Sequence, residues 1–134
     1  MRLPCLALDG WQIEDADEVI AASGRGDMIP VRTLREAVVT GSLCKLFFGT
    51  MGTSSRPEPL WVSVQRREGA KYFGVLLQDA SSPAASEASY LSAGSEVPFA
   101  ARHIADIIAP YELGPDERAL AALPPTQIWA GRGG

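Results

Sequence analysis

The chain has 134 residues, of which 46% are hydrophobic and 21% are charged. This length and composition predict one globular domain, residues 1–134, with a core of its own, and they argue against a disordered chain. Sixteen acidic against twelve basic residues give a net charge of −4, which disfavours nucleic acid as a partner because phosphate backbones require a basic surface.

Residues 1–27 are predicted to form an N-terminal extension with one short acidic helix. The apolar run Leu3–Leu8 predicts a first strand or an arm against the sheet, and it is too short for the core of a signal peptide. Asp15 and Glu18 have the spacing of a helix capping box, which predicts a helix over residues 15–22. No apolar run approaches the length of a membrane span. We therefore expect a cytoplasmic protein that does not bind membranes.

Residues 28–110 are predicted to form a β-rich core that opens with a helix over residues 31–38. Val31, Leu34 and Val38 fall at positions i, i+3 and i+7 of this helix. Such spacing gives one apolar stripe, typical of a helix that packs on a core.

Three consecutive strands follow, and they carry the strongest pattern in the chain. Leu43–Phe48 is strongly apolar, and Leu60–Arg67 alternates between apolar and polar residues. Glu68-Gly69 predicts a tight reversal into a third strand, Lys71–Leu77. Within it, Gly74 indicates a bulge or a close approach of two backbones.

The rest of the chain predicts two shorter strands and a last helix. Glu96–Phe99 and His103–Ile108 are the strands, and residues 111–134 hold a helix over 116–123 and a tail from Thr126 to Gly134. The predicted fold is α+β: a small, strongly bent antiparallel β-sheet or barrel-like domain of five or six strands with two or three short helices. The segments Gly49–Pro59 and Asp79–Ser95 are predicted connections.

His103 is the single histidine, so it is the one candidate general base with an unperturbed pKa near neutrality. Asp106 or Glu96 would orient it, and a Cys44–His103 dyad is a second arrangement. A structural, hydrogen-bonding role is favoured over both, because His103 adjoins an apolar run. We therefore expect a protein that is not an enzyme.

Neither a metal nor a cofactor is expected. Cys5 and Cys44 with one histidine are too few ligands for a zinc site. A disulfide between the two cysteines is one alternative, but reduced thiols, as in cytoplasmic proteins, are favoured.

The candidate binding features are acidic and aromatic side chains. The acidic N-terminal segment would complement a basic protein. Trp61 is either a core residue or an exposed anchor of the kind that dominates protein interfaces. The candidate binding residues are Trp61, Asp15, Asp17, Glu18, Glu58 and Trp129.

Several hydrophobic and turn motifs together resemble a known family. The motifs are Ile29-Pro30, Gly41, Lys45-Leu46, Trp61-Val62, Tyr72-Phe73-Gly74-Val75-Leu76, Gly94–Phe99 and His103–Ile107. Over residues 29–108 this order resembles a family of small bacterial domains of unknown function, some of which are described as toxin immunity proteins. The resemblance implies a strongly bent β-sheet domain and no catalytic residues.

Three functions are left open by the sequence. The leading one is a non-enzymatic protein-binding domain, in one form an immunity protein that neutralises a bacterial toxin by binding it. The second is an accessory subunit of a larger assembly that uses the tail and Trp129. The third is a small enzyme that uses His103. The oligomeric state is left open.

Overall fold

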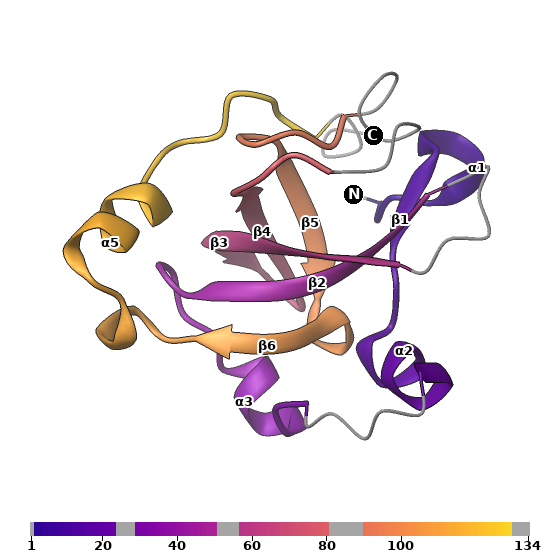
Figure 1. Ribbon diagram of the computed structural model, residues 1–134, viewed down its shortest axis with the longest axis horizontal. Helices are drawn as coiled ribbons and strands as arrows, with labels where there is room; N and C mark the ends of the chain where they lie inside the picture. Colours follow the sequence, from indigo (N-terminus) through magenta and orange to yellow (C-terminus); the bar gives the residue numbers. More distant parts are fainter. Residues whose placement is uncertain (1, 24–28, 51–56, 81–89, 130–134) are drawn as a thin grey trace.

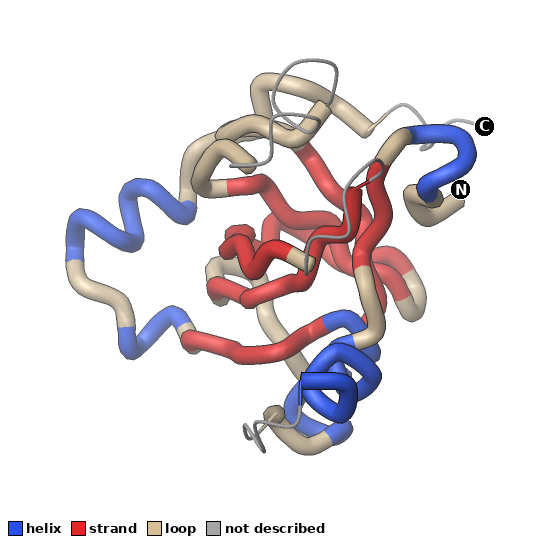
Figure 2. Tube along the Cα trace, turned by 45° about the vertical axis from the view of Figure 1, so that its right-hand side comes forward, coloured by secondary structure: helices blue, strands red, loops and turns tan. Residues whose placement is uncertain are grey.

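The strands form one six-stranded antiparallel sheet that bends into a nearly closed barrel (Figure 1). This computed structural model describes residues 2–23, 29–50, 57–80 and 90–129. Helices lie on the outside of the strands (Figure 2). The predicted α+β barrel-like fold is confirmed. Within the described ranges, no helix is long and apolar enough to cross a membrane.

The elements are short. The strands are β1 (Trp11–Ile13), β2 (Leu43–Thr50), β3 (Glu58–Glu68), β4 (Lys71–Leu76), β5 (Glu96–Ala100) and β6 (Ile104–Ile108). The α-helices in the described residues are α1 (Leu6–Asp9), α2 (Ala16–Ser23), α3 (Arg32–Glu36) and α5 (Pro115–Ala121). Two 3₁₀ turns are η1 (Ala101–His103) and η2 (Pro110–Glu112).

β2 is the strand on which the barrel is built. β3 pairs with one edge of β2, and β4 and β5 follow in order. The other edge of β2 is shared, because β6 pairs with residues 43–46 and β1 with residues 48–50. Strands from the beginning and the end of the chain therefore close the barrel on the same edge.

The side chains of β2 alternate between two environments. Cys44, Leu46 and Phe48 point into the main core. Phe47 lies on the outer face in a cluster with Ala16 of α2, and Leu43 lies in another with Ala121 of α5. The helices therefore cover an outer face that would otherwise expose large apolar side chains.

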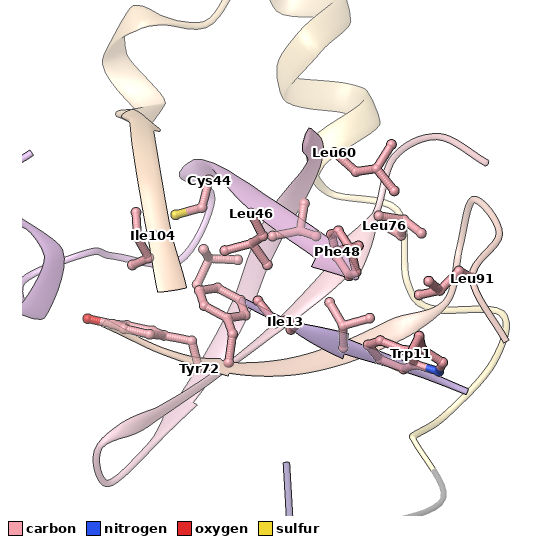
Figure 3. Close-up of a cluster of buried hydrophobic side chains, with 14 of the residues drawn as sticks. Trp11, Ile13, Cys44, Leu46, Phe48, Leu60, Tyr72, Leu76, Leu91 and Ile104 are labelled. Atoms are coloured by element: carbon pink, nitrogen blue, oxygen red, sulfur yellow. The ribbon is translucent and has the colours of Figure 1, made fainter. Parts of the chain in front are cut away.

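The main core is aromatic at both ends. Figure 3 shows Trp11 and Tyr72 among the apolar side chains of the surrounding strands. Tyr72 stacks on Phe99 with 5.4 Å between ring centroids, and the Trp11 ring lies 6.0 Å from that of Phe48. Such pairs add to the free energy of simple area burial.

Gly74 is a close-approach position, as the sequence predicts. The register of β3 against β4 shifts between Val64 and Arg66, next to Gly74. A Cβ atom on Gly74 would lie 2.9 Å from Val62 Cγ2 and 3.1 Å from Phe99 Cε1. Both neighbours are fully buried, so neither can move freely.

Gly74→Ala is therefore expected to lower the free energy of unfolding by about 1–3 kcal/mol through overpacking. Urea denaturation would measure this change. An increase in stability, which a glycine-to-alanine change produces where space exists, would show that Val62 and Phe99 relax around the methyl group.

Of the two alternatives for Leu3–Leu8, a strand or an arm, the strand is wrong, because residues Leu6–Asp9 form the helix α1. Asp9 stabilises this turn, since its Oδ2 accepts a hydrogen bond from Cys5 N (2.9 Å) and pairs with Arg2 Nη1 (2.7 Å). Gly10 ends the helix in the left-handed region at φ 79°. The strand of this region is β1, which was not predicted and places Trp11 in the main core.

The C-terminal tail returns to the sheet as far as the structure describes it. Gln127 bridges to Ser95, and Glu96 N donates to Gln127 O (2.9 Å). Trp129 is buried with only 4% of its surface exposed. Residues 126–129 of the predicted tail therefore pack on the domain, and residues 130–134 lie outside the described ranges.

The other helix predictions are confirmed to within a few residues. Asp15 Oδ1 accepts a hydrogen bond from Glu18 N (3.1 Å) at the start of α2, as the capping-box spacing predicts. Of the two predicted connections, residues 51–56 and 81–89 lie outside the described ranges. Leu91, at the end of the second, is buried in the main core.

Candidate functional site

Two of the predicted acidic residues are exposed on a helix that an ion pair links to a helix with exposed apolar residues. The Asp17 side chain is 63% exposed and Glu18 is also exposed. Val31 and Leu34 of the α3 region are 62% and 59% exposed. We call these four residues the α2–α3 surface. The two helices are linked by Arg35, whose Nη2 lies 3.4 Å from Asp17 Oδ2.

α3 is held on the barrel by polar contacts as well as by Val38. The Tyr72 hydroxyl donates to Arg35 O (2.9 Å), and Arg67 Nη1 donates to Glu36 O (2.5 Å). These bonds satisfy carbonyls at the end of the helix, which have no partner within it. The predicted stripe is therefore correct for Val38, which is buried, but wrong for Val31 and Leu34, which point to solvent.

Trp61 and Glu58 lie on β3. Trp61 is half-buried and packs against the outer-face cluster of Leu43, Leu113 and Ala121 under α5. Glu58 is half-buried at the start of β3, opposite Phe48. These two candidates thus lie on a different element from Asp17 and Glu18, which belong to α2.

Trp129 is a core residue. Its ring lies 5.5 Å from that of Trp11 and 5.8 Å from that of Tyr90, both edge to face. Its indole Nε1 donates to Arg2 O (3.1 Å), and the Arg2 guanidinium lies over the ring. Because these contacts occupy the side chain, Trp129 is not available on the surface and we do not retain it as a binding residue.

A polar pocket opens beside α2. It has a volume of about 260 Å³ and lies between the N-terminal arm, β1, the first residue before α2, and η1. Its lining includes Leu3, Gln12, Ile13, Asp15, Arg102 and His103. Asp15 and His103, which the sequence singled out separately, are thus brought together in one site.

The two ring nitrogens of His103 have different hydrogen-bonding roles. Its Nδ1 accepts from Ala100 N (2.9 Å), so in the neutral ring the proton resides on Nε2. The pKa of His103 is lowered from 6.5 to about 4, first because burial disfavours the charged ring and second because of the Arg102 charge; Asp15 opposes the shift. At neutral pH the ring therefore presents an N–H group and no free lone pair.

The predicted partners of His103 are placed elsewhere. Asp106 is exposed on β6, where its Oδ1 accepts from Ile107 N (2.9 Å). Glu96 is buried and accepts from Trp129 N (3.3 Å). Burial also raises the pKa of the Cys44 thiol to about 12, which acts against a thiolate nucleophile.

A second hollow, of about 340 Å³, lies between β3 and α5. Its polar side chains bond to the protein itself. Gln65 Nε2 donates to Ala121 O (3.0 Å), and Arg118 Nε donates to Pro110 O (3.3 Å). This hollow is therefore a joint between helix and sheet, unlike the pocket at His103.

Neither a metal centre nor a relative helps to assign the site. In residues 2–23, 29–50, 57–80 and 90–129 no three His, Cys, Asp or Glu side chains are grouped so that they could hold a metal ion. Comparisons with protein-family models, with curated proteins and with solved structures found no match.

Proposed function

We propose that this chain is a non-enzymatic protein-binding domain and that the α2–α3 surface is its binding face. The observation that carries the proposal is the exposure of Val31 and Leu34 at the helix α3, which the Arg35–Asp17 pair links to the acidic helix α2. A central apolar contact with a charged rim is the usual composition of a protein interface.

The partner that fits this surface is a protein with a basic rim around an apolar site. Glu18 carries negative charge toward solvent. Asp17 is paired with Arg35 (3.4 Å) and Arg32 with Glu36 (2.6 Å), so these two pairs add no net charge. The chain as a whole carries −4. An acidic surface would attract a basic partner and orient it before contact.

In the form we favour, the partner is a bacterial toxin and the domain is its immunity protein. The support for this form is the motif resemblance over residues 29–108 together with the acidic surface. The proposal places the protein in the cytoplasm, where the free thiols of Cys5 and Cys44 would stay reduced. A binding role also agrees with a neutral, proton-donating His103.

Leu34→Asp is expected to weaken binding of the partner about tenfold or more, because it puts a charge at the centre of the apolar contact. The partner would be co-purified from the source organism, identified, and titrated as a pure protein by calorimetry. Leu120→Asp on α5 is the matched control, since Leu120 is also exposed (45%), and it should leave the affinity unchanged. Equal affinity of the Leu34→Asp variant and the parent would reject the α2–α3 surface.

The immunity form has its own test. Expression of the partner's gene should stop cell growth, and co-expression of this chain should restore it. Co-expression of the Leu34→Asp variant should restore growth less. A partner that is harmless to cells would leave a protein-binding domain but would remove the immunity role.

A further inference from the structure

The His103 pocket contains hydrogen-bonding groups that the protein does not use internally. His103 is buried to all but 4% of its surface. One ring nitrogen is occupied by Ala100 N, whereas Nε2 has no acceptor within the described residues. Nε2 is also not among the unpartnered atoms of those residues that are sealed from solvent. It therefore opens on the pocket that His103 lines.

A second donor lies next to it on η1. Arg102 is exposed and lines the same pocket. Among the residues that the structure describes, no hydrogen bond or ion pair engages its guanidinium. A buried N–H and an unpaired guanidinium side by side are the donors that a carboxylate accepts from.

Acceptors come from the other elements of the pocket. Asp15 uses Oδ1 to cap α2, so its second carboxylate oxygen is left for a ligand. Gln12 donates its amide to Glu14 Oε1 (2.9 Å), which leaves its carbonyl oxygen as an acceptor. A simple anion would meet the negative charge of Asp15, whereas a group that also carries an ammonium would be attracted by it.

We propose that this pocket binds a small zwitterion of the α-amino acid class. The carboxylate would accept hydrogen bonds from His103 Nε2 and Arg102, and the ammonium group would donate to Asp15 and Gln12. Leu3 and Ile13 supply apolar walls for the rest of the molecule. The volume of about 260 Å³ is below the roughly 300–1,000 Å³ of pockets for drug-sized ligands, which fits a ligand of this size.

Calorimetric titration of the purified chain with a panel of free L-amino acids tests the proposal. At least one amino acid should bind saturably, and its N-acetyl and its amide derivative should each bind about tenfold more weakly or worse, because each lacks one charged group. The sole histidine provides a second signal, since its ¹⁵Nε2 resonance should shift on binding.

Two substitutions test the two charged side chains of the pocket separately. Asp15→Asn keeps an oxygen that can cap α2 but removes the charge, so it should weaken the free amino acid about tenfold and the N-acetyl derivative little. Arg102→Gln should weaken the free amino acid and the N-acetyl derivative alike. Leu120→Asp, on the far helix α5, should change neither affinity.

The proposal would be overturned if no amino acid saturates the site at millimolar concentration, or if the N-acetyl derivative binds as well as its parent. It would also be overturned if both substitutions left the affinity intact. Since these titrations use the isolated chain, their outcome does not depend on the proposed protein partner.

Discussion

Trp129→Ala is expected to lower the free energy of unfolding by about 3–5 kcal/mol, the usual loss for a buried tryptophan. The side chain is 4% exposed and contacts both Trp11 and Tyr90. Its removal leaves a cavity against Trp11, which is itself fully buried, and abolishes the hydrogen bond to Arg2 O. Urea denaturation followed by far-UV circular dichroism would measure the change.

Ile128→Ala is the matched control for this prediction. Ile128 is the preceding residue and is 50% exposed, so its substitution should alter stability by less than about 0.5 kcal/mol. Equal and small effects at both positions would mean that the end of the chain does not pack on the core.

The burial of Trp129 also bears on the accessory-subunit hypothesis. Deletion from Thr126 onward should destabilise the domain rather than only remove a contact with a partner.

Local sequence patterns were sufficient to predict most of the sheet. The alternation in Leu60–Arg67, the Glu68-Gly69 reversal and Gly74 all reflect constraints within one hairpin, and each is found in the structure. The caps of α2 and α5 are equally local, since Glu18 N bonds to Asp15 and Gly114 N to Glu117.

The errors arose where distant segments decide the structure. β1 has only three residues, and it exists because Trp11 and Ile13 can pair with the end of β2. Trp129 is fixed by Trp11 and Tyr90, which no pattern near the C-terminus reveals. Val31 and Leu34 have the spacing of a buried stripe, but polar bonds from Tyr72 and Arg67 hold the helix so that both residues face solvent.

The sequence identified individual candidate residues, but it did not predict which of them lie together in one site. Asp15 and His103 are candidates for different reasons, the first as a helix cap and the second as the single histidine. Only the fold brings the start of α2 against η1, where the two side chains share a pocket. The bond from Ala100 N to Nδ1 agrees with the hydrogen-bonding role that the sequence favours for His103, and it leaves the N–H group of the neutral ring on Nε2.

The stability of this protein is expected to decrease as the pH falls from about 6.5 to about 4. In the unfolded chain His103 takes up a proton near pH 6.5, whereas in the folded protein its pKa is about 4 because of burial. Between these values the unfolded state binds one more proton, so acidification favours unfolding. The difference corresponds to about 3 kcal/mol, at about 1.4 kcal/mol per pH unit. The contribution is fully present above pH 6.5 and is lost by about pH 4.

Urea denaturation between pH 7 and pH 4.5 would measure this loss, and His103→Gln is the control. The glutamine oxygen can accept the hydrogen bond from Ala100 N, but the side chain does not titrate, so the variant should lose much less stability over the same range. Carboxylates such as Asp9, whose pKa is lowered first by its hydrogen bond to Arg2, lose their contribution at lower pH, as they protonate. Because the chain has one histidine, nuclear magnetic resonance can also follow the ring directly in the folded protein. A titration midpoint near 6.5 there would contradict both the burial of His103 and the pH dependence derived from it.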